Sequence, residues 1–261
     1  MFDSGFGGLT VARALIDLAP HMDVVYFGDT GRYPYGTKSP AEVRGYAMEI
    51  AGLLVGRFDP RMLVVACNTA AAVVIDDLRD MLDIPVVGVI EPGLRAAAEV
   101  TRSGRVGVIG TVGTIASGAY EVAAELLPDH VHLTTAACPG FVEFVERGET
   151  DSAQMIVLAE RLLAPVREAD VDTLLLGCTH YPYLARTIST VMGRDVVLVS
   201  SADETAFDVR ARLGDCEPTS KVGRRHFISS GDANAFERIG RQLFGGELID
   251  AEEHRWTGTT T

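Results

Sequence analysis

Two cysteines each follow a short apolar run, and each is followed at once by side chains that can form hydrogen bonds. The two segments are Leu63-Val64-Val65-Ala66-Cys67-Asn68-Thr69 and Leu174-Leu175-Leu176-Gly177-Cys178-Thr179-His180. Such runs are typical of buried strands in a parallel sheet, and open α/β sheets bind ligands at the carboxyl ends of their strands. Two thiols delivered by two similar units predict one site with a base on either side. A reaction that needs a base on each face of one carbon is a stereoinversion.

A core role is the alternative interpretation for each cysteine, because buried cysteines are common and usually inert. Cys67 and Cys178 differ from ordinary core residues in the polar residues that follow them, for which a core strand has little use. Both also lie near expected helix N-termini, whose partial positive charge predicts a thiol pKa below the usual value of about 8.5. Cys138 and Cys216 lack such neighbours, and we interpret them as structural.

The residue pattern argues against a metal or an organic cofactor. The chain has no C-x-x-C pair, and His180 is the only histidine adjacent to either cysteine unit, whereas zinc sites need four ligands. Pyridoxal phosphate requires a lysine, and neither Lys38 nor Lys221 follows a recognisable strand. The run Gly5-Phe6-Gly7-Gly8 lacks the third glycine of a dinucleotide-binding motif. The sequence therefore predicts chemistry without metal or cofactor.

Two further residues have chemistry suited to proton transfer. Asp3 ends an expected first strand ahead of a glycine-rich turn, where a carboxylate can orient a proton carrier or hold an ammonium group. His180 lies two residues after Cys178 and can act as an acid/base partner for that thiol. The first strand has few residues before Asp3, so we expect either a stunted strand or a natural start upstream.

Composition narrows the class of protein. The 261 residues are 47% hydrophobic and carry a formal charge of −13, with no block of lysines and arginines. A nucleic acid or an anionic membrane surface is therefore not expected as a partner. No apolar stretch reaches membrane-spanning length, and the start does not resemble a signal peptide. Four widely spaced cysteines do not form a disulfide framework, so we expect a cytoplasmic protein with reduced thiols.

Strand and helix patterns alternate along the chain, which predicts an α/β fold of parallel βαβ units. Besides the first strand and the runs before Cys67 and Cys178, we expect strands at 23–29, 86–90, 106–109, 131–136, 196–199 and 226–228. We expect helices at 11–18, 41–57, 70–82, 94–100, 152–167, 202–213 and 233–244. The helix at 41–57 has a capping box at Ser39–Glu42, with Pro40 at its first position.

Two points suggest where the chain crosses between lobes. Glu91-Pro92-Gly93 is a plausible first crossing, and the second is expected near Ser200–Glu204. If the last strand rejoins the first lobe, residues 1–92 and 205–261 form one α/β lobe and residues 93–204 form a second, inserted lobe.

Together the motifs resemble those of the glutamate racemases over about residues 1–205. In the first half they are Asp3-Ser4-Gly5-x-Gly7-Gly8-Leu9-Thr10, Phe27-Gly28-Asp29-Thr30, Pro34-Tyr35-Gly36 and Cys67-Asn68-Thr69. In the second half they are Gly110-Thr111-x-Gly113-Thr114-Ile115, Cys138-Pro139, Phe144-Val145-Glu146-x-Gly148 and Gly177-Cys178-Thr179-His180-Tyr181-Pro182. The chain departs from the family in its short lead-in to the first strand and at Phe6, where a smaller aliphatic residue is usual.

The resemblance implies two similar α/β lobes, each with a mostly parallel sheet flanked by helices, related by a pseudo-twofold axis with the substrate between them. It implies inversion of L-glutamate to D-glutamate by two bases without a cofactor, for peptidoglycan synthesis and hence cell-wall formation and cell shape, and a homodimer. Cys67 and Cys178 would be the two acid/base groups, with Asp3 assisting Cys67, and His180 and Glu146 assisting Cys178. The implied substrate-binding residues are Asp3, Ser4, Pro34, Tyr35, Gly36, Asn68, Thr69, Thr111, Thr114, Thr179 and His180.

Other functions share parts of this pattern. An aspartate racemase or an amino-acid racemase of broader specificity would have the same two thiols, and relative rates on glutamate and aspartate would separate them. A decarboxylase of this fold needs only one protonating thiol, so the presence of both Cys67 and Cys178 argues against it. Some glutamate racemases also inhibit DNA gyrase, but no surface for that partner is evident in this acidic chain.

Overall fold

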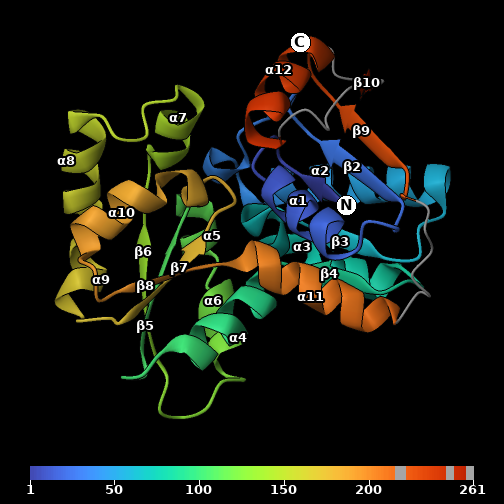
Figure 1. Cartoon of the computed structure of the whole chain (residues 1–261). Helices are drawn as coiled ribbons and strands as arrows, with labels where there is room; N and C mark the ends of the chain where they lie inside the picture. The colour runs from blue at the N-terminus through green and yellow to red at the C-terminus, as the bar shows by residue number, and fades with distance from the viewer. Residues whose placement is uncertain (215–221, 245–249, 257–261) are drawn as a thin grey trace.

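The computed structural model describes residues 1–214, 222–244 and 250–256; Cys216 and Lys221 lie outside the described residues. Strands and helices alternate along the chain and form two parallel sheets flanked by helices (Figure 1). The predicted α/β class is therefore confirmed. No helix within the described ranges is long and apolar enough to cross a membrane.

The first sheet takes its strands from both ends of the chain. Its order is β10 (Ala251–Glu253), β9 (Arg225–Ser229), β2 (Val24–Gly28), β1 (Phe2–Asp3), β3 (Leu63–Val65) and β4 (Val86–Gly88). The two residues of β1 are completely buried between β2 and β3, and Phe2 is in register with both Phe27 and Val65. Asp3 therefore lies at the carboxyl edge of the sheet, beside the end of the strand that precedes Cys67.

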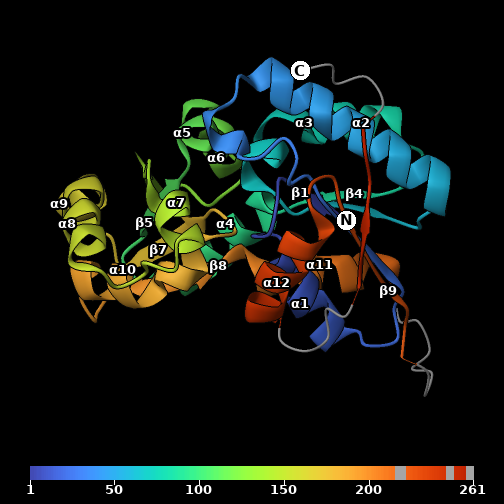
Figure 2. The ribbon, with the colours of Figure 1, turned by 90° about the horizontal axis from the view of Figure 1, so that it is seen from above.

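Helices cover both faces of the first sheet (Figure 2). On one face lie α2 (Pro40–Phe58) and α3 (Asn68–Met81), and on the other lie α1 (Leu9–Leu18), α11 (Ser201–Leu213) and α12 (Ala233–Phe244). Helix α2 begins with the predicted capping box, in which the Glu42 backbone N–H donates to the Ser39 hydroxyl (3.3 Å) and the Ser39 N–H to the Glu42 carboxylate (3.0 Å). With helices on both sides, the strands are buried on both faces, which explains their unbroken apolar runs.

The second sheet repeats the order of four neighbouring strands in the first sheet. Its order is β6 (His132–Ala137), β5 (Arg105–Gly110), β7 (Thr173–Gly177) and β8 (Val197–Ser200). The sequence β6-β5-β7-β8 corresponds to β2-β1-β3-β4, so β7 occupies the position that β3 has in the first sheet. Cys67 follows β3 and Cys178 follows β7. The two cysteines therefore follow equivalent strands of the two sheets.

The remaining helices lie around the second sheet and the junction (Figure 1). They are α4 (Ile90–Val100), α5 (Val112–Ala116), α6 (Ala119–Ala124), α7 (Phe141–Glu146), α8 (Ala153–Leu162), α9 (Ala164–Glu168) and α10 (Ala185–Met192), with the 3-10 helices η1 (Tyr35–Thr37) and η2 (Tyr181–Leu184). Alternate residues of the second sheet belong to different cores: Leu174 and Leu176 pack with one, whereas Leu175 packs with the core of the first sheet. The two halves thus share buried surface through the α4 and α11 layer.

Several helix boundaries differ from the predictions. Helix α4 begins at Ile90 instead of 94, so Glu91-Pro92-Gly93 forms its first turn, where a proline loses no intrahelical hydrogen bond. The helix expected at 152–167 is two helices, α8 and α9, because Pro165 cannot continue the hydrogen-bond ladder of the first. Helix α3 starts at Asn68, two residues before the predicted start at 70, which makes Cys67 its N-cap residue.

Candidate active site

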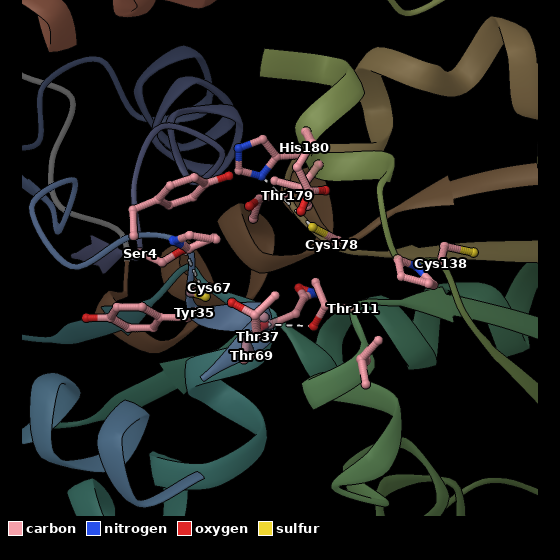
Figure 3. Close-up of a pocket in the computed structure, with 18 of the residues that line it drawn as sticks. Ser4, Tyr35, Thr37, Cys67, Thr69, Thr111, Cys138, Cys178, Thr179 and His180 are labelled. Atoms are coloured by element: carbon pink, nitrogen blue, oxygen red, sulfur yellow. Dashed lines mark hydrogen bonds between the residues drawn. The ribbon is translucent and has the colours of Figure 1, made fainter. Parts of the chain in front are cut away.

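Both conspicuous cysteines lie at the carboxyl edges of their sheets and line one cavity between the lobes. Cys67 links β3 to α3, and Cys178 links β7 to the turn that leads into η2. Both are free and buried, with exposed fractions of 5% and 7%. Figure 3 shows the two sulfur atoms approaching the same hollow from the two halves of the molecule.

The cavity has a volume of about 610 Å³, part of which is open to solvent. Most of the predicted site residues line it: Ser4, Pro34, Tyr35, Gly36, Cys67, Asn68, Thr69, Thr111, Cys178, Thr179 and His180. The sequence reasoning missed another group of lining residues: Tyr33, Thr37, Val112, Cys138, Pro139, Gly140, Val142 and Glu143. Most of these residues belong to or directly adjoin the motifs that contain Pro34, Thr111 and Cys138-Pro139, and this closeness in sequence could have indicated them.

Three predicted site residues lie outside the lining. Asp3 is fully buried behind it, where its carboxylate accepts hydrogen bonds from the Gly5 N–H (2.8 Å) and the Thr179 hydroxyl (3.4 Å). Thr114 is also fully buried, and Glu146, on α7, has its carboxylate 4.0 Å from the Nε2 atom of His180. These residues therefore touch lining groups and act on the cavity through them.

The Asp3–Thr179 contact joins the two halves of the site. Asp3 comes from the first sheet, and Thr179 follows Cys178 of the second sheet. A Cβ atom on Gly7 would lie 2.2 Å from the Thr179 hydroxyl and 2.6 Å from the His180 ring nitrogen, so the glycine-rich turn packs directly on this junction. Glycine at position 7 is thus required by the close approach of the two lobes.

Hydroxyl groups form a second junction on the opposite side of the cavity. The hydroxyl of Thr69, on α3, lies 3.0 Å from that of Thr111 and 3.1 Å from that of Thr114, and the last two are 2.9 Å apart. Each hydroxyl is both a donor and an acceptor, so the cluster can rearrange its protons to suit an incoming anion. Thr114 supports the two hydroxyls that line the cavity.

The predicted acidification of the thiols by helix N-termini is wrong. Burial raises the pKa of Cys67 to about 11, aided by the nearby Asp3 carboxyl and opposed by the backbone N–H of Ala70 in α3. Burial also raises the pKa of Cys178, which a negative charge on Cys67 or Asp3 would raise further. The desolvation of a thiolate therefore outweighs the favourable helix terminus.

Burial controls the neighbouring acid/base groups as well. It raises the pKa of Asp3 above its usual range, although the backbone N–H groups around it act in the opposite direction. It lowers the pKa of His180 to about 4, so the imidazole is neutral near pH 7. The Nδ1 atom of this ring lies 3.9 Å from the Cys178 sulfur. His180 is thus placed to exchange a proton with the thiol as a neutral group.

The buried polar atoms of the lining residues have two kinds of surroundings. The Tyr33 hydroxyl and the His180 Nε2 atom lie near the Glu146 carboxylate, whereas the Asn68 side-chain oxygen is buried without a hydrogen bond to the described residues. Because buried polar groups are normally satisfied, the Asn68 oxygen indicates a place for a polar ligand. None of the described lining residues is a lysine or an arginine, so uncharged donors such as hydroxyl, side-chain amide and backbone N–H groups must bind any carboxylate.

No cluster suited to a metal ion is present within the described ranges. The ammonium group of Lys38 lies over the ring of Tyr46, with its nitrogen 5.7 Å from the ring centre, and Lys38 is not among the lining residues. The residues of the cavity thus offer thiols, an imidazole, carboxyl groups and hydroxyls, which suit proton transfer.

Known racemases are similar to this chain in both sequence and structure. A family model described as Asp/Glu/hydantoin racemase matches residues 9–206. The chain is 51% identical to the glutamate racemase of Acidothermus cellulolyticus over 252 residues, covering 95% of each protein. Its structure is similar to that of a glutamate racemase isoform from Bacillus anthracis, with a TM-score of 0.91, 39% identity and coverage of 100% of this chain and 97% of that one. It is also similar to the glutamate racemase of Francisella tularensis in complex with D-glutamate, with a TM-score of 0.89, 29% identity and coverage of 97% and 95%.

Proposed function

This chain belongs to the Asp/Glu/hydantoin racemase family, and we propose that it interconverts L- and D-glutamate by moving a proton between the α-carbon and two thiols. The observation that carries the proposal is the pair of buried cysteines, which leave equivalent strands of two similar sheets and line one cavity. The names of the relatives supply the substrate, because glutamate racemases match nearly the whole length of the chain.

In this mechanism one sulfur is a thiolate and the other a thiol when the substrate binds. The thiolate of Cys67 or Cys178 removes the α-hydrogen as a proton and leaves the electron pair on the substrate. The opposite thiol then gives its proton to the other face of the same carbon. The products are the mirror-image amino acid and an enzyme whose thiol and thiolate have exchanged places, so protons and charge balance.

The charges around the cavity fit a single thiolate at a time. A charge on Cys67 raises the pKa of Cys178, and a charge on Asp3 raises the pKa of both. The substrate brings an ammonium group into a site whose described lining contains no basic side chain apart from the neutral His180. A positive charge nearby lowers the pKa of a thiol, so substrate binding would itself promote the thiolate that the reaction needs.

The deprotonated α-carbon needs stabilisation, because no electron-withdrawing cofactor is part of the proposal. Its negative charge spreads into the adjacent carboxylate, which requires hydrogen-bond donors aimed at the oxygens. Ser4 and Thr69 line the cavity and carry hydroxyl groups, and α3 presents its first backbone N–H groups directly after Cys67. These groups are our candidates for binding the α-carboxylate in the transition state.

Asp3 and Glu146 would assist the two thiols from behind the lining. The raised pKa of Asp3 brings it closer to that of a thiol and supports its service as a proton acceptor near Cys67. Glu146 is close to both His180 and Tyr33, and its own pKa is raised by burial. A His180–Glu146 pair would orient the imidazole toward Cys178, as carboxylates orient histidines in other acid/base sites.

The wider role is also a proposal. Thiols that exchange protons must remain reduced, which fits the cytoplasm. The family resemblance supports a homodimer and a supply of D-glutamate for peptidoglycan, and hence a part in cell-wall formation and cell shape.

The experiment is circular dichroism of L-glutamate and D-glutamate, each incubated with purified protein without added cofactor. Both signals should decay to zero. Cys67→Ser and Cys178→Ser should each slow racemisation by at least about a thousandfold, the loss typical of removing a positioned acid/base group. Each variant should still bind D-glutamate and retain its unfolding temperature, which controls for damage to the fold. Near wild-type racemisation by Cys178→Ser would disprove the two-thiol mechanism. If the protein racemises aspartate as fast as glutamate or faster, the proposal that glutamate is its substrate is wrong.

A further inference from the structure

We propose that Asp29 is a positioning residue for the substrate pocket, and that it anchors the Tyr35 wall of the cavity to Trp256 near the carboxyl end of the chain. The inference rests on the proposed function only for the identity of the ligand, glutamate. The Phe27-Gly28-Asp29-Thr30 motif has no part in the mechanism above, and Asp29 follows β2 without lining the cavity.

Asp29 is completely buried and accepts hydrogen bonds on both carboxylate oxygens. One oxygen accepts from the Tyr35 hydroxyl and from the Arg32 guanidinium (2.8 Å). The other accepts from the Ser230 hydroxyl (2.5 Å) and from the indole N–H of Trp256 (3.2 Å). We call these five residues the Asp29 cluster. Hydrogen bonds to a buried carboxylate are among the stronger ones in proteins, so the cluster fixes the relative positions of its donors.

Tyr35 connects the cluster to the cavity. Tyr35 is the first residue of η1 and lines the cavity. Figure 3 shows its hydroxyl pointing away from the two cysteines. The hydroxyl is therefore committed to Asp29, and the ring and backbone form the wall. The next residue, Gly36, fits closely against the other lobe, since a Cβ there would lie 2.9 Å from the Cβ of Thr111.

Trp256 completes the far side of the cluster. The Arg32 guanidinium lies between two aromatic rings, 4.0 Å from the centre of Trp256 and 4.2 Å from that of Tyr46. Arg32 also pairs with Glu49 of α2, and Trp256 packs against Phe27 of β2, with ring centres 5.6 Å apart. The cluster thus joins the segment after β10 to the pocket loop and to α2.

This arrangement carries a positioning role because the loop between β2 and α2 has regular structure only in η1. Its side-chain contacts therefore determine where Tyr35, Gly36 and Thr37 stand against the cavity. Asp29 holds the loop from β2, while Ser230 and Trp256 hold Asp29 from segments about 200 residues later in the chain. Loosening any of these contacts should let the wall move away from the substrate.

A displaced wall should weaken glutamate binding more than it slows proton transfer. The wall contacts substrate and transition state alike, and loss of such uniform binding raises KM while kcat stays the same. We expect Tyr35→Phe, which removes only the hydroxyl, to raise KM and the Kd for D-glutamate about tenfold, as for the loss of a hydrogen bond to a charged group. We expect Trp256→Phe, which keeps an aromatic ring, to raise both about threefold through the weaker anchorage of Asp29.

A matched control lies on β10, shortly before Trp256 in the chain. Glu252, in β10, accepts hydrogen bonds from Arg57 (2.6 and 2.8 Å) and contacts His226 (2.9 Å), without touching the Asp29 cluster. Glu252→Gln should loosen β10 and lower the unfolding temperature while leaving KM and kcat unchanged. It therefore separates a general weakening of the carboxyl-terminal segment from an effect on the pocket.

The test measures KM, kcat, unfolding temperature and, by calorimetry, the Kd for D-glutamate in the wild type and all three variants. A rise of Kd and KM in Tyr35→Phe and Trp256→Phe, with kcat within about twofold, supports the proposal if Glu252→Gln keeps the wild-type Kd, KM and kcat. Unchanged Kd values with lowered unfolding temperatures would overturn it and leave the cluster a purely structural role. A wild type that binds D-glutamate without racemising it would refute the proposed function. In that case the Kd values of the wild type and the variants would still show whether the Asp29 cluster positions the pocket wall.

Discussion

The raised thiol pKa values predict slow, steeply pH-dependent alkylation of the empty enzyme. With a pKa of about 11, Cys67 is about 0.1% ionised at pH 8, against about 24% for a thiol of pKa 8.5. The stronger nucleophilicity of the more basic thiolate recovers about tenfold of this roughly 240-fold difference. Ionisation alone should therefore slow alkylation about 20-fold relative to glutathione-like thiols at pH 8. Limited access to a buried thiol slows the reaction further.

The shape of the pH profile separates ionisation from access, because access does not change the slope. Substrate-free protein would be treated with iodoacetamide between pH 7 and 10, and alkylation at Cys67 and Cys178 would be followed by mass spectrometry of their separate peptides. We expect each rate to rise about tenfold per pH unit without a plateau below pH 10, since both pKa values lie above that range. A small thiol with a pKa near 8.5 is the control and should level off. A plateau for Cys67 below pH 9 would refute the argument that burial dominates its ionisation.

Two further predictions concern packing and pH. Gly7→Ala places a methyl group 2.2 Å from the Thr179 hydroxyl and should lower the free energy of unfolding by about 1–3 kcal/mol and racemase activity at least about tenfold. The control is Gly45→Ala, which has open space around its Cβ and should keep full activity. Equal activities of the two variants would contradict the close approach at Gly7. Burial lowers the pKa of His180 to about 4, so the unfolded state, with a pKa of about 6.5, takes up the proton first as pH falls. The contribution of His180 to the free energy of unfolding, about 3 kcal/mol, is present above pH 6.5 and lost toward pH 4. Between pH 7 and 4.5 the free energy of unfolding, measured with urea, should therefore fall by about 2–3 kcal/mol more in the wild type than in His180→Asn. Equal losses in the two proteins would contradict this assignment.

The parts of the site that could be predicted are those with local signals. Short apolar runs ending in a cysteine and polar residues indicated both strand ends, because parallel strands buried on two faces need such runs. The capping box at Ser39 fixed the start of α2 within one residue. The α/β class followed from the alternation of these local patterns.

Other parts depend on contacts between distant residues, which one sequence does not reveal. The link from Asp29 to Trp256 spans 227 positions, and the strand β10 that positions Trp256 was not expected. The sign of the thiol pKa shifts was also mispredicted, since the helix terminus is visible in the sequence whereas the degree of burial around Cys67 depends on the assembled cores. Asp3 acts on the pKa of Cys67, and its side chain also accepts a hydrogen bond from Thr179 of the other half, a contact that the sequence does not reveal.

The equivalent strand ends of the two sheets give their thiols different neighbours, since the Cys67 sulfur lies 3.6 Å from the Ser4 hydroxyl oxygen and the Cys178 sulfur lies 3.9 Å from Nδ1 of His180. In the proposed mechanism the two protonation forms of the free enzyme therefore differ in free energy. Mirror-image substrates have the same free energy in solution, so the Haldane relationship requires equal kcat/KM for the two directions. The unequal thiols can thus make kcat and KM differ between the two directions, but they cannot make kcat/KM differ. Net flux toward D-glutamate must come from the reactions that consume it.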